Sequence, residues 1–410
     1  MIRIIQRALI CWVLCVNVTS AQELVMATTL SSEATEHIIS QWQKQPLATK
    51  IRTLNRTSAS IERLLENPLG ENIDLVLSSS PMLLQRLQSK NLLQPFNNQI
   101  ETSRKLVPES IRSTTVAVAV SGYGILINVA HLEDKNEPVP TSWKELSRSR
   151  YQGTLLKSRP SPSDTTHLMI EDLLQQQGWS NGWGTLLKIG GNLATISSRS
   201  FGVANKISTG LGDAGPVIDN YANVLLNNST LRFSYFPNSR AAPMFIAIAN
   251  GSKHPQEAGR FINFLLSQEG QQALSDSDSG KYPVFHLPSV TRLADQQLRL
   301  FASPSLDYPL IMQRQKLVQL LFDNAITFRL TELQNSWKSL YAAEHRLKRK
   351  LPDVRALLTA VPVTPEQSVN SMYLQQFELQ SGFREAQLMA WQQFFLHQQQ
   401  LVNTQLESLK

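Results

Sequence analysis

Residues 116–128 read VAVAVSGYGILIN, and this stretch decides the fold. Its apolar residues run on both sides of a Ser121-Gly122 pair, which predicts one long strand bent near its middle. Glycine adopts backbone conformations that other residues avoid, so the pair permits a hinge. A second apolar run over 233–237, continuing at 244–249, would carry the chain back. Two such crossings predict two lobes with a cleft between them, where small ligands usually bind.

The two crossings divide the chain into parts. Strand-like runs alternate with helical patterns from Leu24 onward, which is the pattern of an α/β protein with parallel sheets. We therefore expect lobe I over 22–119 plus 237–287, and lobe II over 120–236. The rest, 288–410, reads as a helical region beyond both lobes.

The first residues have the features of an export signal. Arg3 and Arg7 precede an apolar core, and small residues lead to Ala21. The apolar stretch is shorter than the roughly 20 residues that span a membrane. This pattern predicts a secretory signal peptide over 1–21, with a mature chain that begins at Gln22 and is located in the periplasm.

Composition excludes several classes of protein. Cys11 and Cys15 are the only cysteines and lie in the signal peptide, so the mature chain has no disulfide, thiol nucleophile or cysteine metal ligand. The formal charge of +7 falls to +5 once Arg3 and Arg7 are removed. This excess suits an anionic ligand but is too weak and dispersed for nucleic acid. No later run of about 18 apolar residues predicts a membrane span.

Hydroxyl residues gather where apolar runs end. Clusters at 28–32, 56–60 and 78–80 follow strand-like runs, and a fourth, 158–166, precedes a helical pattern. At the ends of parallel strands such junctions bring backbone N–H groups, hydroxyls and positive helix ends to one edge of a sheet. Each cluster alone is also an ordinary helix cap or turn. Their repetition favours an anion site.

Arg56 and Arg199 lie among these hydroxyls, one in each expected lobe. A guanidinium holds a phosphate or carboxylate bidentately, so one arginine from each side would make lobe closure depend on the ligand. Asp164 stabilises a helix start but repels phosphate, so Ser163 and Thr165 rank above it. The predicted ligand-binding residues are Thr28, Thr29, Arg56, Thr57, Ser58, Ser79, Ser163, Thr165, Ser198, Arg199, Asp219 and Tyr221.

Catalytic and metal-binding motifs are absent from the sequence. The histidines form no His-x-x-x-His or His-Glu-x-x-His spacing, and no Gly-x-Ser-x-Gly elbow, Walker A loop or dinucleotide fingerprint occurs. No hydroxyl is spaced beside a base as an activated nucleophile would be. We therefore expect a binding protein and not an enzyme, with no metal and no cofactor.

Residues 250–272, NGSKHPQEAGRFINFLLSQEGQQ, resemble a helix pair of periplasmic solute-binding proteins. This resemblance covers roughly 24–285 and implies a two-lobed periplasmic binding protein fold, type II-like, with two hinge crossings. Iron-binding relatives of that fold present an adjacent tyrosine pair where this chain has Tyr221 alone. Ferric iron therefore ranks last among the ligands considered.

A closer resemblance runs through nearly the whole chain. It is carried by residues 51–58 (IRTLNRTS), 113–122 (STTVAVAVSG), 195–204 (TISSRSFGVA), 215–223 (GPVIDNYAN) and 280–284 (GKYPV). These segments are similar to the phosphoglycerate transport regulatory proteins of enterobacteria. The resemblance implies a periplasmic component that acts with a membrane sensor kinase and its response regulator to induce uptake of phosphoglycerates and phosphoenolpyruvate.

Two other functions remain open. One is a solute receptor of an ABC importer for an organophosphate, a phosphonate or, last, ferric iron. The other is a phosphohydrolase, which would turn over phosphoglycerate. The importer receptor shares the cleft and differs only in its partner.

The helical region adds a final expectation. Helical spacing of apolar residues from Leu310 to about Lys350 predicts a helix ended by Pro352 and packed on lobe I. A second helical stretch, 372–409, is rich in glutamine. It is interpreted either as a partner surface or as part of the core, with the partner-surface hypothesis resting on its aromatic residues Phe377, Trp391, Phe394 and Phe395.

Overall fold

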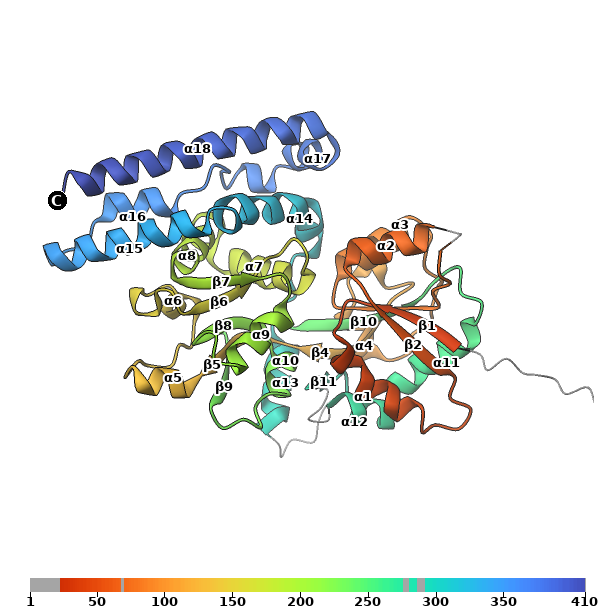
Figure 1. Cartoon of the computed structure of the whole chain (residues 1–410). Helices are drawn as coiled ribbons and strands as arrows, with labels where there is room; N and C mark the ends of the chain where they lie inside the picture. The colour runs from red at the N-terminus through yellow and green to blue at the C-terminus, as the bar shows by residue number, and fades with distance from the viewer. Residues whose placement is uncertain (1–22, 68–69, 276–279, 286–291, 410) are drawn as a thin grey trace, which may run out of the picture.

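The structure is a computed structural model that describes residues 23–67, 70–275, 280–285 and 292–409 (Figure 1). Two sheets lie side by side, each surrounded by helices, and a layer of C-terminal helices covers one of them. The predicted two-lobed α/β fold with a helical extension is therefore confirmed. The signal peptide predicted over 1–21 lies outside the described residues.

The first sheet and its helices form lobe I. The strand order is β11-β4-β10-β3-β1-β2. The strands are β1 (Glu23–Thr28), β2 (Lys50–Asn55), β3 (Leu75–Ser78), β4 (Val116–Ser121), β10 (Ala242–Ile248) and β11 (Tyr282–Pro283). The helices are α1 (Ser32–Trp42), α2 (Ser58–Glu66), α3 (Pro81–Ser89), α4 (Glu101–Leu106), α11 (Pro255–Leu265) and α12 (Gln268–Ser275).

The second sheet and its helices form lobe II. Its strand order is β7-β6-β8-β5-β9. The strands are β5 (Tyr123–Asn128), β6 (Leu155–Ser158), β7 (Leu193–Ser197), β8 (Ala214–Ile218) and β9 (Leu231–Tyr235). The helices are α5 (Val129–Asp134), α6 (Trp143–Leu146), α7 (Asp164–Gln177), α8 (Trp179–Asn192), α9 (Ser200–Ser208) and α10 (Asp219–Asn223).

Both sheets are mixed, which corrects the expectation of parallel sheets. β1 pairs in parallel with β2 and β3, and β6 pairs in parallel with β7 and β8. Each sheet also contains antiparallel pairs, because β10 is antiparallel to β3 and β4, and β5 is antiparallel to β8 and β9. The parallel strands still end at a common edge in each lobe.

The crossings lie where the bent strand predicts them. β4 belongs to the first sheet and β5 to the second, and only Gly122 separates them. A Cβ atom on Gly122 would lie 2.8 Å from Leu300 Cδ2 and 3.0 Å from Tyr235 Cε1, so close packing favours glycine here. The chain returns between β9 and β10.

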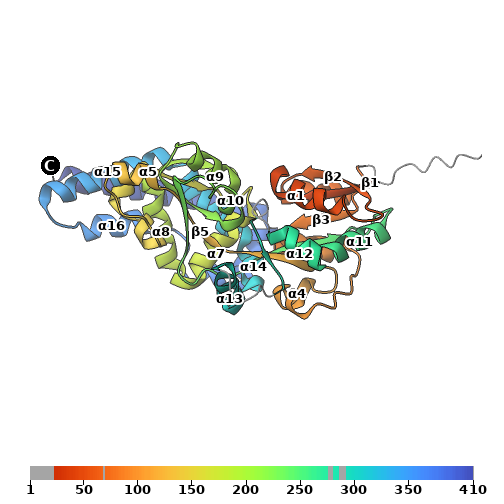
Figure 2. The ribbon, with the colours of Figure 1, turned by 90° about the horizontal axis from the view of Figure 1, so that it is seen from below.

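The C-terminal layer consists of helices that follow lobe I in sequence but pack on lobe II (Figures 1 and 2). It contains α14 (Tyr308–Phe322), a π-helical turn (Asp323–Thr327), α15 (Leu330–Leu347), α16 (Pro352–Thr359), α17 (Ser371–Leu379) and α18 (Ser381–Glu407). The preceding helix, α13 (Arg292–Ala302), lies apart from this layer at the hinge, where Leu300 packs with Val120 and Tyr282 of lobe I (Figure 1). Within the described residues, none of the helices combines the length and apolar character that a membrane crossing needs.

The expected packing of this layer on lobe I is wrong. α14 contacts α7, and α15 and α16 contact α8. One reason lies in α8, where a Cβ atom on Gly191 would come within 2.2 Å of Trp337 Cδ1. The missing side chain lets the buried Trp337 of α15 approach the α8 backbone. One apolar cluster therefore joins lobe II and the C-terminal layer.

Two details of the layer also differ from expectation. Pro352 begins α16 instead of ending the preceding helix, because proline is well tolerated in the first turn. α15 ends earlier, where Lys348 adopts a left-handed conformation with φ of 50°. Phe377, Trp391 and Phe395 are buried inside the layer, which favours the core alternative for 372–409 over the partner surface. Phe394 is half-buried and packs against the same cluster.

Candidate ligand-binding cleft

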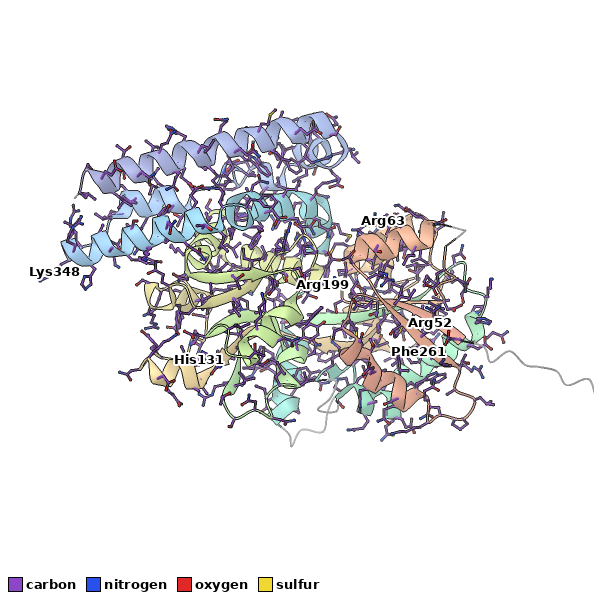
Figure 3. All side chains as sticks on the ribbon, in the orientation of Figure 1. Arg52, Arg63, His131, Arg199, Phe261 and Lys348 are labelled. Atoms are coloured by element: carbon purple, nitrogen blue, oxygen red, sulfur yellow. The ribbon has the colours of Figure 1, made fainter. Side chains whose placement is uncertain are left out.

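An inner cavity lies between the lobes, where strand-to-helix junctions of both sheets meet. Its volume is about 20 Å³, which is close to the space one water molecule needs. Figure 3 places Arg199 at this boundary between the lobes. The cavity is lined by Thr29, Ser58, Ser79, Ser80, Pro162, Ser163, Asp164, Thr165, Arg199, Ser200, Phe201 and Tyr221.

Lobe I supplies hydroxyl groups that follow its parallel strands. Thr29 follows β1, and its Oγ1 lies 2.9 Å from the Oγ of Ser78, the last residue of β3. Ser80 caps α3, accepting a hydrogen bond of 3.1 Å from the backbone N–H of Leu83. Thr57 caps α2 in the same way through the N–H of Ser60, at 3.3 Å. The positive ends of α2 and α3 therefore lie on this side of the cleft.

Lobe II supplies the opposite wall. Ser163 caps α7 by accepting a 3.4 Å hydrogen bond from the Thr166 N–H. Arg199 precedes α9, which has no side-chain cap. Its guanidinium donates to Pro162 O at 3.1 Å and reaches Asn55 Oδ1 of lobe I at 3.5 Å. Arg199 therefore makes a hydrogen bond within lobe II and also contacts lobe I.

Ser200 is a lining residue that sequence reasoning missed. Its side chain is buried, and its Oγ has no hydrogen-bond partner among the described residues. It is the first residue of α9, whose uncapped backbone N–H groups lie beside it. A buried hydroxyl without a partner is unfavourable, so an acceptor entering the cavity would find a donor already desolvated. The serine-rich run around Arg199 was the available signal.

Seven of the predicted ligand-binding residues line the inner cavity. They are Thr29, Ser58, Ser79, Ser163, Thr165, Arg199 and Tyr221. Five do not line it. Thr28 is buried behind the wall, where it accepts from the Leu30 N–H. Arg56 and Ser198 are exposed, and Asp219 lies at the hinge. Thr57 lines a larger adjoining space of about 760 Å³, which we call the outer chamber.

Asp219 connects the two crossings. Its Oδ2 accepts a 2.7 Å hydrogen bond from the Gly122 N–H and a 3.0 Å hydrogen bond from the Tyr235 hydroxyl. Burial raises the pKa of Asp219 to about 7, partly offset by the hydrogen bond from Gly122. Burial also lowers the pKa of Lys281 to about 8, and the Asp219 carboxylate opposes this change. The carboxylate predicted to contact ligand thus lies inside the hinge.

Asp164 lies where the inner cavity meets the outer chamber. Its Oδ2 accepts a hydrogen bond from Ser58 Oγ across the cleft, and its Oδ1 accepts one of 3.3 Å from Gln315 Nε2 of α14. The carboxylate is thus engaged by hydrogen-bond donors from lobe I and from the C-terminal layer. Within the described ranges, no three His, Cys, Asp or Glu side chains are placed to hold a metal ion.

Comparison with known proteins identifies the family to which the chain is similar. Residues 70–303 match the family model of bacterial extracellular solute-binding proteins. The chain is 54% identical over 390 residues to the phosphoglycerate transport regulatory protein PgtC of Salmonella typhimurium, covering 95% of this chain and 98% of that protein. It is 23% identical over 233 residues to a provisionally named 2-aminoethylphosphonate-binding periplasmic protein of the same organism, covering 54% of this chain and 65% of that protein.

A solved structure supports the fold alone. The periplasmic binding protein AfuA of Actinobacillus pleuropneumoniae, bound to fructose-6-phosphate, superposes with a TM-score of 0.64 at 15% identity, covering 74% of this chain and 98% of that one. These relatives regulate transport or bind solutes. The chain therefore belongs to the bacterial extracellular solute-binding protein family and is a relative of the phosphoglycerate transport regulatory protein.

Proposed function

We propose that this chain is a periplasmic receptor for phosphorylated three-carbon acids, meaning phosphoglycerates and phosphoenolpyruvate. On binding, it signals to the periplasmic part of a membrane sensor kinase, which acts with a response regulator to induce the phosphoglycerate transporter. It binds without a metal or cofactor and does not turn the ligand over. A cleavable signal peptide delivers it to the periplasm.

The main support for an anionic ligand is the lining of the inner cavity. Arg199, the partnerless hydroxyl of Ser200 and the uncapped start of α9 all lie on one wall, opposite the helix starts of lobe I. Phosphate and carboxylate groups are bound well by this combination of a guanidinium, hydroxyls and backbone N–H groups. The proposed ligand-binding residues are the seven predicted residues that line the cavity, together with Ser200.

The mechanism is lobe closure. The inner cavity has room for about one water molecule, so the lobes part to admit a three-carbon phosphate and then close around it. Ligand shifts the equilibrium only by the difference between its affinities for the two arrangements. Contacts from both lobes provide that difference, and the closed arrangement is the one that reports to the kinase.

The regulatory role is supported by the extent of similarity. The 54% identity to the transport regulatory protein extends over 95% of the chain and so includes the C-terminal layer. The solute-binding family match ends at residue 303, before α14 begins. A receptor serving an ABC importer of an organophosphate or phosphonate is the second candidate, supported by the phosphonate-binding relative.

Calorimetric titration of the mature chain tests the ligand. We expect 2-phosphoglycerate, 3-phosphoglycerate or phosphoenolpyruvate to bind in the presence of a metal chelator and to be recovered unchanged. At 100 times its dissociation constant, the ligand should stabilise the fold by about 2.7 kcal/mol. Binding of 2-aminoethylphosphonate or ferric citrate alone, or turnover of phosphoglycerate, would refute the proposal.

A transcriptional reporter tests the partner. In cells that lack the chain, we expect phosphoglycerate to induce the transporter only after the chain is restored, and only if the sensor kinase is present. If the restored chain is needed for uptake while induction is unaffected, the importer receptor is the correct assignment.

A further inference from the structure

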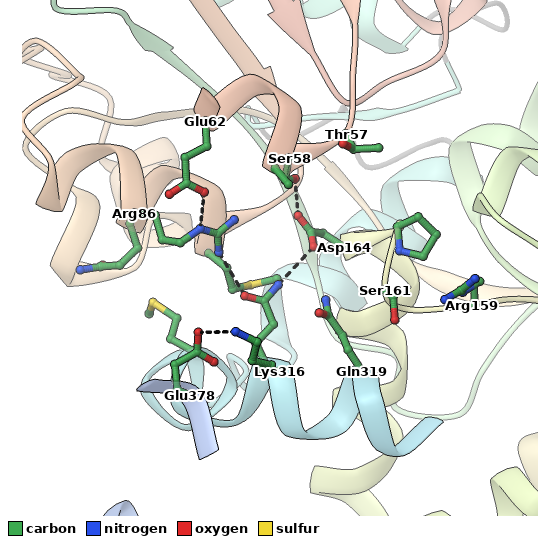
Figure 4. A pocket seen from close by; sticks show the side chains of 16 residues that line it. Thr57, Ser58, Glu62, Arg86, Arg159, Ser161, Asp164, Lys316, Gln319 and Glu378 are labelled. Carbon is green, nitrogen blue, oxygen red and sulfur yellow. Dashed lines mark hydrogen bonds and ion pairs between the residues drawn. The ribbon is translucent and has the colours of Figure 1, made fainter. Parts of the chain in front are cut away.

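The cleft continues outward into the outer chamber, which has a volume of about 760 Å³ (Figure 4). Ser58, Pro162 and Asp164 line both the chamber and the inner cavity, so the two spaces adjoin. α2 and α3 of lobe I form one wall of the chamber, and residues 159–164 of lobe II form a second. The third wall comes from the C-terminal layer, through Met312, Gln315, Lys316 and Gln319 of α14 and Glu378 of α17.

α14 is fixed to lobe II. Arg314 Nε and Nη2 donate to Glu171 Oε1 and Oε2 of α7 at 2.9 and 2.6 Å, and both side chains are buried. Asp323, just after α14, accepts a 2.7 Å hydrogen bond from Arg159. Ile311, Val318, Leu321 and Phe322 add apolar contact to the same cluster. α14 therefore moves with lobe II when the lobes move.

From this fixed position α14 reaches lobe I through Gln315. Arg86 Nη1 of α3 donates to Gln315 Oε1 at 3.1 Å, while Gln315 Nε2 donates to Asp164 Oδ1 at 3.3 Å (Figure 4). Asp164 in turn accepts from Ser58 of α2. A continuous path of hydrogen bonds thus begins and ends in lobe I and passes through the C-terminal layer and lobe II. Met82 of α3 packs into the cluster that contains α14.

The chamber is not a second anion site. Each of its cations is paired with a carboxylate, since Arg86 bonds Glu62 at 2.8 Å, Arg159 bonds Asp323 and Lys316 lies 3.4 Å from Glu378. The Arg86–Glu62 pair also orients the Arg86 guanidinium, whose Nη1 donates to Gln315 Oε1. The geometry favours a contact between lobes over a site for a further charged ligand.

We infer that α14 is a third wall of the ligand cleft and that Gln315 is the positioning residue that couples lobe closure to the C-terminal layer. The inference rests on the proposed function, because closure around ligand is what Gln315 would favour. Opening the lobes breaks the Arg86–Gln315 and Ser58–Asp164 bonds together, so Gln315 raises the closed population. Apparent ligand affinity rises with that population. The family match ends at residue 303, so this wall lies outside it.

The test compares Gln315→Ala with Gln319→Ala. Both residues belong to α14 and line the chamber, but Gln319 Nε2 donates to Pro160 O of lobe II and so makes no bond between lobes. We expect Gln315→Ala to weaken binding of 3-phosphoglycerate by about 5- to 30-fold, mainly through faster dissociation, because the hydrogen bond that Gln315 makes to the charged Arg86 of lobe I is lost. Gln319→Ala should bind as the unmodified chain does.

Lobe distance gives a readout that packing alone would not change. The mature sequence lacks cysteine, so spin labels can be placed at Leu47→Cys in lobe I and Leu211→Cys in lobe II, both of which are exposed. We expect Gln315→Ala to lengthen the distance between labels, with or without ligand, relative to Gln319→Ala. Equal distances in the two variants, or a lower melting temperature of Gln315→Ala with unchanged distance, would overturn the inference.

A double-mutant cycle completes the test. Arg86→Ala and Gln315→Ala should each weaken affinity, and the double variant should be little worse than either, since both remove one bond. Additive losses would overturn the inference. The distance measurement needs no ligand, so it tests Gln315 even if no phosphorylated acid binds and the proposed function fails.

Discussion

The backbone N–H of Gly122 donates a 2.7 Å hydrogen bond to Asp219 Oδ2, joining the first crossing between the lobes to the start of α10. The same oxygen accepts from the Tyr235 hydroxyl at the end of β9, just before the second crossing. Tyr235 is also within 2.7 Å of the Tyr282 hydroxyl of lobe I. Asp219 is thus a shared support of both crossings between the lobes.

The pKa of Asp219 predicts how this hinge responds to pH. Burial raises the pKa to about 7 from 3.8, so the folded chain binds a proton that the unfolded chain has already lost. The contribution of this group to stability is therefore complete below pH about 4 and is lost as pH rises to about 7. We expect Asp219→Asn to remove this dependence of unfolding free energy on pH. Burial lowers the pKa of Lys281 to about 8, so Lys281 titrates above the pH range of about 4 to 7.

Urea denaturation at several pH values between 4.5 and 7 measures the effect. The quantity to compare is the difference in unfolding free energy between the unmodified chain and Asp219→Asn, because other carboxylates titrate in both. Asp295→Asn is the control, since Asp295 is exposed on α13. A difference that stays constant across the range would show that Asp219 does not titrate there.

The bent strand and the hydroxyl clusters could be predicted because their causes are local. An apolar run interrupted by Ser121-Gly122 marks a crossing, and Thr57, Ser80 and Ser163 cap helices through bonds to residues three positions on. Asp219 was predicted to contact the ligand but lies in the hinge, because a polar residue after a buried strand can face either a cavity or a hinge. The choice depends on sheet order, which the sequence does not encode locally.

The prediction that the C-terminal layer packs on lobe I failed for a related reason. Helical spacing shows that one face of a helix is buried but not what buries it. The answer depends on a long-range fit between Gly191 of α8 and Trp337 of α15. Aromatic side chains such as Trp391 occur both in cores and at interfaces, and the sequence alone did not separate the two.

The buried aromatics of the C-terminal layer predict a stability effect. Trp391 is 2% exposed and stacks on Phe377 with ring centroids 5.4 Å apart. We expect Trp391→Ala to lower the unfolding free energy by about 3–5 kcal/mol through loss of buried surface and formation of a cavity. Met389→Ala, exposed on the same helix, should change it by no more than about 0.5 kcal/mol.

Truncation extends this prediction. A chain that ends at Pro365 loses α17 and α18 and exposes the apolar faces of α14, α15 and α16. We expect its melting transition to be lowered and broadened, with aggregation on heating. An unchanged cooperative melt would mean that α17 and α18 contribute little to the core.

Arg199 and Arg56 should behave differently as ligand contacts. Arg199 lines the inner cavity, whereas Arg56 is exposed and donates to the neighbouring Asn55 O at 2.8 Å. We expect Arg199→Ala to weaken phosphoglycerate binding by about 10- to 150-fold, the range for a lost hydrogen bond to a charged group. Arg199→Lys should restore only part, because an ammonium lacks the planar fork.

Arg56→Ala is the matched control and should bind within about threefold of the unmodified chain, since Arg56 does not line the inner cavity. Calorimetric titration measures both affinities under the same conditions. A large loss in Arg56→Ala would mean that ligand binding draws Arg56 into the cleft, and wild-type affinity in Arg199→Ala would remove Arg199 from the site.

Comparing Ser200 with Ser197 tests whether the Ser200 hydroxyl binds ligand or only packs in the interior. Both side chains are buried, and neither Oγ has a hydrogen-bond partner among the described residues, but only Ser200 lines the inner cavity. Removing a buried hydroxyl that has no partner relieves its desolvation penalty. We therefore expect Ser200→Ala and Ser197→Ala each to leave unfolding free energy unchanged or to raise it by up to about 1 kcal/mol.

Ligand affinity should distinguish the two variants. Ser200→Ala should weaken binding of 3-phosphoglycerate by about fivefold, because a donor to the anion is lost, whereas Ser197→Ala should bind normally. A more stable protein with a weaker site is the pattern expected when a polar group is kept for binding and not for folding. If Ser200→Ala binds as tightly as the unmodified chain, the anion does not reach the start of α9, and the phosphate position must be sought at the helix starts of lobe I.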